Sequence, residues 1–210
     1  MKYFALLNTL FKFVIETSKK YNIDESHALK HSMEVHYYSS KIYENEFPSN
    51  PLLADQLNII LASSVLHDMC DKKYMEQSKG LDNIKMFLSD KISPTENSLV
   101  QKIISTMSYS TVKKNGYPLL GDYQTAYHIV READLLSAYD FDRCVMYQMA
   151  HHNDNYENSV KISIDLFEHR VLKYIDDGLF TTRYAKLQSQ NLHKTAFNKL
   201  NSIKKIYQIR

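Results

Sequence analysis

Glycine and proline are scarce in this chain, and their scarcity limits what it can fold into. The 210 residues contain four of each, where average usage would give roughly 25 of the two together in a chain of this length. All four prolines lie between Pro48 and Pro118, so long stretches at both ends contain no residue that must break a helix. We therefore expect an all-α fold with one core, because the length suits a single domain.

The few glycines also argue against one class of nucleotide site. A P-loop needs glycine where the backbone approaches phosphate, followed by Lys and then Ser or Thr. Gly116 and Gly121 have the five-residue step of such a loop, but Asp122 and Tyr123 stand where Lys and Ser or Thr would be needed. ATP binding of that kind is therefore not expected.

Several features indicate a soluble, cytoplasmic protein. No apolar run reaches the roughly 18 residues typical of a membrane span, and the apolar N-terminal stretch is interrupted by Lys12 and has no small-residue cleavage site. The net charge is +2, and the two cysteines, Cys70 and Cys144, are too few for a disulfide framework. We expect no membrane partner.

Apolar residues recur at helical spacing along most of the chain. Helices are predicted over 4–21, from Asp24 or Ser26 to about 42, over 53–66, from Pro94 to about 107, over 126–145 as one helix or two, over 162–175, and after Gly178. The start at Ser93-Pro94-Thr95-Glu96 is indicated by a serine N-cap, a proline at the first helical position and a glutamate that closes a capping box. Residues 110–122 are predicted to be a loop, with 113–120 as a hypothetical substrate lid.

The C-terminal segment is strongly basic. Residues 178–210 contain seven basic residues and no acidic one, whereas the rest of the chain has 19 basic and 24 acidic residues. Such a helix can attract nucleic acid or another anionic partner. The alternative is that its apolar side chains dock on the core while the lysines face water; these are Tyr184, Leu187, Phe197, Leu200 and Ile203.

Two histidines and two aspartates form the pattern that carries chemistry. His67-Asp68 closes an apolar helix, where burying an imidazole beside a carboxylate is costly unless they bind each other, a proton or a cation. His31 and Asp134, on other predicted helices, can complete a set of two imidazoles and two carboxylates. This mixed set suits a divalent metal ion such as Mn, Fe, Co, Mg or Zn and leaves positions for water and a substrate oxygen.

The order His31, His67-Asp68, Asp134 resembles the H…HD…D signature of the HD-domain metal-dependent phosphohydrolases, and among them the small single-domain bacterial-type proteins. The surrounding segments 30–35, 62–68 and 129–136 are similar to the family's motif contexts, and 166–173 and 181–185 resemble its tail more loosely. The resemblance implies one HD domain over 1–210, with the signature in 27–140 and a helical extension, 158–210, packed on it.

The resemblance also implies roles for individual residues. His31, His67, Asp68 and Asp134 would hold one divalent ion (Mn, Mg, Co, Ni, Fe or Zn), which lowers the pKa of bound water and neutralises charge on phosphate; Asp68 would thereby also be catalytic. Asp71 matches the acidic position of an HD-x-x-[ED] run and would orient or deprotonate water. The alternative for Asp71 is an exposed carboxylate without a role.

Three further side chains are candidates on the same basis. Lys72 would act on phosphate oxygens during catalysis and Lys73 would bind substrate, as lysines do in similar proteins; the alternative for both is a solvated surface position. His27, one predicted helical turn before His31, would contact substrate or support a ligand. A structural hydrogen bond is the alternative for His27.

The chain departs from the family pattern in two places. Residues 105–109 lack the histidine that many relatives carry there, so a single metal is expected and the oxygen-using di-iron branch is disfavoured. Residues 137–140 replace the glycines that usually follow the Asp134 motif.

The sequence thus predicts a phosphohydrolase acting on a nucleotide or related phosphate ester or anhydride. The alternative is a catalytically weak module that senses a nucleotide or binds nucleic acid through 178–210. Assembly into a homodimer is left open.

Overall fold

The computed structural model describes residues 2–152 and 155–209, and within them the chain is helical without strands. The elements are α1 (Lys2–Tyr21), α2 (Leu29–Glu46), η1 (Pro51–Gln56), α3 (Leu57–Leu66), α4 (Gln77–Leu88), α5 (Pro94–Thr106), α6 (Tyr109–Asn115), η2 (Gly121–Tyr123), α7 (Gln124–Ser137), α8 (Phe141–His152), α9 (Tyr156–His169), η3 (Val171–Lys173) and α10 (Arg183–Tyr207). The predicted all-α class is confirmed. None of the described helices has the length and apolar character needed to cross a membrane.

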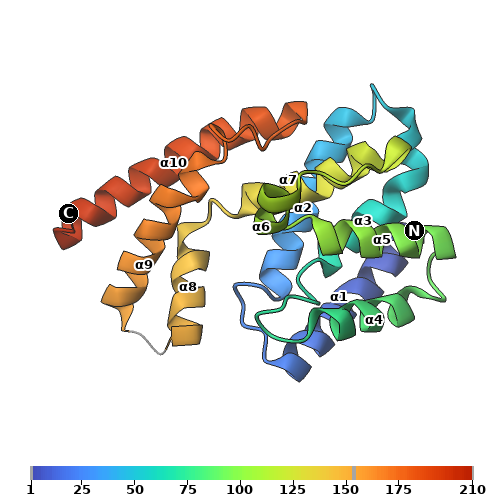
Figure 1. Cartoon of the computed structure of the whole chain (residues 1–210), viewed down its shortest axis with the longest axis horizontal. Coiled ribbons are helices and arrows are strands. Elements are labelled where there is room, and N and C mark those ends of the chain that lie inside the picture. Colours follow the sequence, from blue (N-terminus) through green and yellow to red (C-terminus); the bar gives the residue numbers. More distant parts are fainter. Residues whose placement is uncertain (1, 153–154, 210) are drawn as a thin grey trace.

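Helix α3 is the centre of the larger part of the molecule (Figure 1). Every residue from Ile59 to Leu66 is buried, because α3 is surrounded by α1, α2, α5 and α7. A helix that is apolar on all sides is stable only in such a position. Helices α2 and α7 also pack on each other, so the ends of α2, α3 and α7 are held close together.

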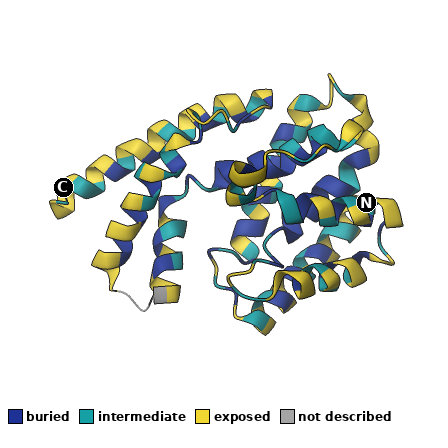
Figure 2. Ribbon diagram, viewed as in Figure 1, coloured by how far each residue is buried: buried dark blue, intermediate teal, exposed yellow. Residues whose placement is uncertain are grey.

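Helices α8, α9 and α10 form a second group on one side of this bundle (Figure 1). Helices α8 and α9 pack on each other, and α10 packs on α2 and α7. Buried residues, dark blue in Figure 2, follow the contacts between helices in both groups. The C-terminal helices therefore lie against the bundle, beside the ends of α2 and α7.

One buried carboxylate anchors the start of α10 to α7. Glu132 is fully buried and accepts hydrogen bonds from the backbone amides of Thr181 (2.8 Å) and Thr182 (3.0 Å). It also accepts from the Thr182 hydroxyl (2.7 Å) and from Arg131 Nη2 (3.0 Å). The anchor lies two residues before Asp134.

The capping box at Ser93 is confirmed, since Ser93 Oγ accepts from the Glu96 amide and Glu96 accepts from the Ser93 amide.

The predicted start of the second helix at Asp24 or Ser26 is wrong, because α2 begins at Leu29. Asp24 Oδ1 instead accepts from the Ser26 amide (2.9 Å), which stabilises a turn that competes with helix. His27 therefore lies before the helix rather than on its face.

The predicted loop over 110–122 is wrong in its first half. Helix α6 occupies Tyr109–Asn115, and Ser108 Oγ accepts from the Thr111 amide to cap it (3.3 Å). The loop is reduced to residues 116–120, so the lid imagined over 113–120 would include the end of a helix.

Other boundaries also differ from expectation. The pattern did not predict α4, and the helix expected over 162–175 ends at His169. The predicted docking of α10 is correct for Leu200, which is buried, but wrong for Leu187 and Phe197, which are 64% and 48% exposed. Small residues such as Ala185, Ser189 and Ala196 occupy the buried face of α10 instead.

Candidate metal centre

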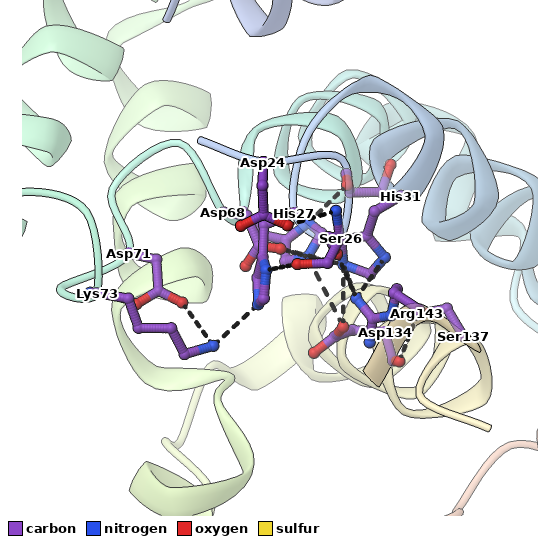
Figure 3. A network of polar contacts seen from close by, with 12 residues as sticks. Asp24, Ser26, His27, His31, Asp68, Asp71, Lys73, Asp134, Ser137 and Arg143 are labelled. Atoms are coloured by element: carbon purple, nitrogen blue, oxygen red, sulfur yellow. Dashed lines mark hydrogen bonds and ion pairs between the residues drawn. The ribbon is translucent and has the colours of Figure 1, made fainter. Parts of the chain in front are cut away.

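The helix ends of the bundle bring the four predicted ligands together. Figure 3 labels three of them, His31, Asp68 and Asp134. His31 comes from the first turn of α2, His67 and Asp68 directly follow α3, and Asp134 lies in the last turn of α7. Because α2, α3 and α7 pack on one another, side chains far apart in sequence meet at one point.

The donor atoms of these four residues are close to each other. His31 Nε2 lies 3.0 Å from His67 Nε2, 3.1 Å from Asp68 Oδ2 and 3.5 Å from Asp134 Oδ1. His67 Nε2 lies 3.3 Å from Asp68 Oδ2 and 3.7 Å from Asp134 Oδ1. The two Nε2 atoms and one oxygen of Asp134 lie within 4.8 Å of one another, and Asp68 Oδ2 lies close to both Nε2 atoms.

The site has the marks of a cation site. Both histidines are buried, and Asp68 Oδ2 is buried with no well-oriented hydrogen-bond partner among the described residues. The ring nitrogen His67 Nδ1 donates to the Ser64 carbonyl (2.9 Å). Once a metal ion displaces the proton on Nε2, the lone pair of the ring is therefore on Nε2 and directed at the cluster. Ligands held about 2.0–2.2 Å from one ion stand about as far apart as these donor atoms do. The residues therefore fit a divalent metal ion.

The protonation equilibria of the cluster show strong mutual attraction. Burial by itself would lower the pKa of His67, but the Asp68 and Asp134 carboxylates outweigh burial and raise it to about 9. Burial would raise the pKa of Asp68, yet His67 and His31 hold it well below its usual value. The same two histidines also lower the pKa of Asp134. The carboxylates are thus ionised and attract a positive charge.

Asp71, Lys72 and Lys73 line a pocket of about 180 Å³ that also includes His67, Asp68 and Asp134. Asp71 Oδ1 accepts from the Lys73 amide (2.9 Å), and its Oδ2 lies 3.4 Å from Lys73 Nζ. The predicted acid and both predicted lysines therefore share one pocket with three of the candidate ligands.

His27 and Lys73, both predicted to bind substrate, contact each other. Lys73 Nζ donates to His27 Nε2 (2.9 Å), so the proton of the neutral ring is on Nδ1. Nδ1 lies 2.6 Å from Ser26 Oγ and 3.0 Å from the Tyr74 hydroxyl, and Tyr74 donates to Asp24 Oδ2 (2.6 Å). Burial, helped by Lys73 and Arg143, lowers the pKa of His27 to about 3, so the ring is neutral.

Sequence reasoning missed two arginines of the C-terminal helices. Arg143 Nη1, from α8, donates to the Ser26 carbonyl (3.1 Å) and lies 2.8 Å from Nδ1 and 3.0 Å from Nε2 of His31. The guanidinium and a metal ion would compete for His31 Nε2. Arg170, at the end of α9, lines the pocket of Asp71 and a second pocket beside it. Arg143 lies outside the family-like segments, so only the packing of α8 reveals it.

Comparison with known proteins shows the fold alone. No protein-family model matches the chain, and no curated protein matches it. A crystal structure of a Lactobacillus plantarum protein, determined as a structural-genomics target, superposes with a TM-score of 0.73 over 97% of each chain at 16% sequence identity. The arrangement of helices thus also occurs in a solved structure.

Proposed function

We propose that this chain is an HD-type, metal-dependent phosphohydrolase acting on a nucleotide or a related phosphate ester or anhydride. The observation that carries the proposal is the cluster of His31, His67, Asp68 and Asp134, in which the Nε2 atom of each histidine lies 3.0–3.7 Å from that of the other and from one oxygen of each aspartate. Both histidines are buried and both carboxylates are partly buried. Basic side chains surround it in two adjoining pockets. A cation site beside other positive charges suits a substrate that is an anion.

The proposal assigns a task to each group. The four ligands would hold one divalent ion, which when bound supplies an acidic water and polarises a phosphoryl group. Asp71 would accept the proton of the attacking water, since it lines the same pocket as Asp68 and Asp134. Lys72 and Lys73 would bind phosphate oxygens by charge-assisted hydrogen bonds.

Turnover by metal-loaded protein tests this function. The protein is stripped with a chelator, reloaded separately with Mn, Co, Ni, Mg, Fe or Zn, and assayed with nucleoside tri-, di- and monophosphates, cyclic nucleotides and ppGpp-like compounds. Asp68→Ala should lose both metal and turnover, because it removes a ligand. Asp71→Asn should keep its metal and lose about 10²–10⁴-fold in kcat, the usual contribution of a general base.

The same variants separate the possible outcomes. Full activity of His67→Ala or Asp68→Ala would contradict the metal site. Metal binding without turnover of any substrate, in wild type as well as Asp71→Asn, would favour a binding module over an enzyme.

Nucleic-acid binding through the basic helix α10 is the second candidate function. Lys199 pairs with Asp142 (2.6 Å) and Lys204 with Glu168 (2.9 Å), so two of its charges are already used within the chain. Lys186, Lys194 and Lys205 are exposed. If α10 binds RNA or DNA, Lys186→Glu together with Lys194→Glu should weaken binding of a fluorescent oligonucleotide and flatten its salt dependence.

A further inference from the structure

A second pocket of about 280 Å³ lies beside the metal cluster, between the bundle and the C-terminal helices. Lys73 and Arg170 line both this pocket and the pocket of Asp71, so the two adjoin there. Arg143 also lines the second pocket and contacts His31. Three positive side chains therefore stand where the second pocket meets the cluster.

Arg170 is held with its terminal nitrogens unused. Its Nε donates to the Tyr174 hydroxyl (3.1 Å), and its guanidinium lies over the Tyr109 ring, 4.4 Å from the centroid. Within the described residues, neither terminal nitrogen has a hydrogen-bond partner. A guanidinium oriented in this way can offer two parallel N–H groups to a phosphate.

Gln148 adds an unsatisfied acceptor to the same pocket. Its side chain, on α8, lines the pocket and is only 7% exposed. The amide oxygen Oε1 is buried and has no hydrogen-bond partner among the described residues. Burying an amide oxygen without a donor is unfavourable, so a ligand that supplies a donor would relieve this cost.

The surroundings of Gln148 limit what such a ligand can be. Tyr147 and Phe167 give the pocket aromatic and apolar surface next to the polar groups. Its volume is below the roughly 300 Å³ at which pockets for drug-sized ligands begin. The ligand is thus a small organic group that carries an O–H or N–H donor and is attached to a phosphate.

We infer that this second pocket binds the organic part of the substrate, a phosphate monoester of a single nucleoside or sugar, and that Gln148 selects it. Arg143, Arg170 and Lys73 bind the phosphate at the junction with the cluster, and Gln148 Oε1 accepts a hydrogen bond from a hydroxyl or N–H of the organic group. This inference rests on the proposed phosphohydrolase function and narrows its substrate class.

Binding of defined phosphates to the full, metal-stripped chain tests the inference without turnover. The probes are uridine 5′-monophosphate and ribose 5-phosphate, which carry donors, phenyl phosphate, which carries none, and inorganic phosphate. Gln148→Met keeps the side-chain length and removes the acceptor; it should weaken the two donor-carrying ligands about tenfold and leave phenyl phosphate within about twofold. Arg170→Gln should weaken all four probes about tenfold.

A control variant and a substitute variant accompany Gln148→Met. Gln190→Met, an exposed position on α10, should change no affinity. Gln148→Leu is the substitute if Gln148→Met fails to fold by circular dichroism. Equal affinities of Gln148→Met and wild type for all probes would overturn the inference. Phosphate affinities that Arg170→Gln leaves unchanged would overturn it as well.

Turnover distinguishes this inference from the proposed function. If the metal-loaded chain hydrolyses phosphates but Gln148→Met leaves the KM for uridine 5′-monophosphate unchanged, the inference fails and the function stands. If no phosphate is hydrolysed but Gln148→Met weakens only donor-carrying ligands, the pocket assignment stands and the hydrolase proposal fails.

Discussion

At the scale of single residues, His27 shows how position changes the chemistry of a side chain. Its ring lies between Lys73, which donates to Nε2, and Ser26 and Tyr74 at Nδ1. A protonated ring could not accept the hydrogen bond from Lys73 and would place two cations in contact. His27 is therefore a neutral acceptor that orients Lys73 toward the pockets.

This arrangement predicts a pH dependence of stability. The pKa of His27 in the fold, about 3, lies below the ordinary value of 6.5, so the unfolded chain binds a proton that the folded chain does not. The stability from neutral His27 is fully present above about pH 6.5 and is lost as the pH falls toward 3. Urea unfolding should show that the free energy of unfolding falls less between pH 7.5 and pH 5 in His27→Gln than in wild type.

A direct measurement checks the same point. The His27 ring signals in an NMR titration should stay those of a neutral imidazole down to pH 5. A midpoint near 6.5 would contradict the burial and contacts that the structure assigns to this ring.

The four candidate ligands could be singled out residue by residue from the sequence, but Arg143, Arg170 and Gln148 could not. His67-Asp68 stands out because a polar pair follows an apolar helix, and that is a local property of the chain. Gln148 lies in a segment whose sequence has no comparable change from apolar to polar residues. Its importance comes from an unpaired buried oxygen, which exists only once α8 packs beside the cluster.

At the scale of elements, the turn after α3 depends on a close contact with α4. Gly80 of α4 lies so close to Cys70 that an added Cβ would be 2.5 Å from Cys70 Cβ and 2.6 Å from its Cα. Cys70 is two residues after Asp68, so α4 holds the segment that carries His67 and Asp68. Glycine is needed here because α4 approaches Cys70 closely, and not because of a positive φ.

Gly80→Ala should therefore destabilise the protein although alanine favours helix. The clash of its Cβ with backbone should cost about 1–3 kcal/mol of unfolding free energy, more than the gain of about 1 kcal/mol in helix propensity. Denaturant unfolding measures the difference, with Lys79→Ala on the same helix as the control. Because the Cα of residue 70 takes part in the clash, Cys70→Ala should not rescue the variant; full rescue would contradict this account.

Element boundaries were predictable where capping residues act locally and not elsewhere. The box of Ser93 and Glu96 needs only neighbours within one turn. The start of α2 at Leu29 instead follows a turn stabilised by Asp24, and a sequence pattern does not show whether Asp24 caps a helix or a turn. Helix α6 has only seven residues, too few for a periodic pattern.

At the scale of the whole molecule, Glu132 joins the two groups of helices. Its carboxylate binds Thr181 and Thr182 at the start of α10 and Arg131 beside it on α7. Arg131 is itself only 2% exposed. The position of the start of α10 beside the candidate metal site thus depends on the buried, hydrogen-bonded carboxylate of Glu132.

Glu132→Gln should cost about 3 kcal/mol of stability, because it leaves the buried Arg131 guanidinium without its counter-charge. Hydrogen exchange should become faster at residues 181–189, where α10 begins. The control is Glu157→Gln, which removes an exposed partner of Lys161 and should leave the Tm unchanged. Unaltered exchange at the start of α10 in Glu132→Gln would show that other contacts hold it.

The sequence by itself determined the helical class and pointed to the four candidate ligands. Both follow from local properties, namely the lack of helix breakers and the placing of polar residues at the ends of apolar helices. The tertiary structure alone decided where α8, α9 and α10 lie, and with them the place of Arg143, Gln148 and Arg170. Helix formation depends on neighbours in sequence, whereas the walls of a pocket depend on packing between helices distant in sequence, which no local pattern encodes.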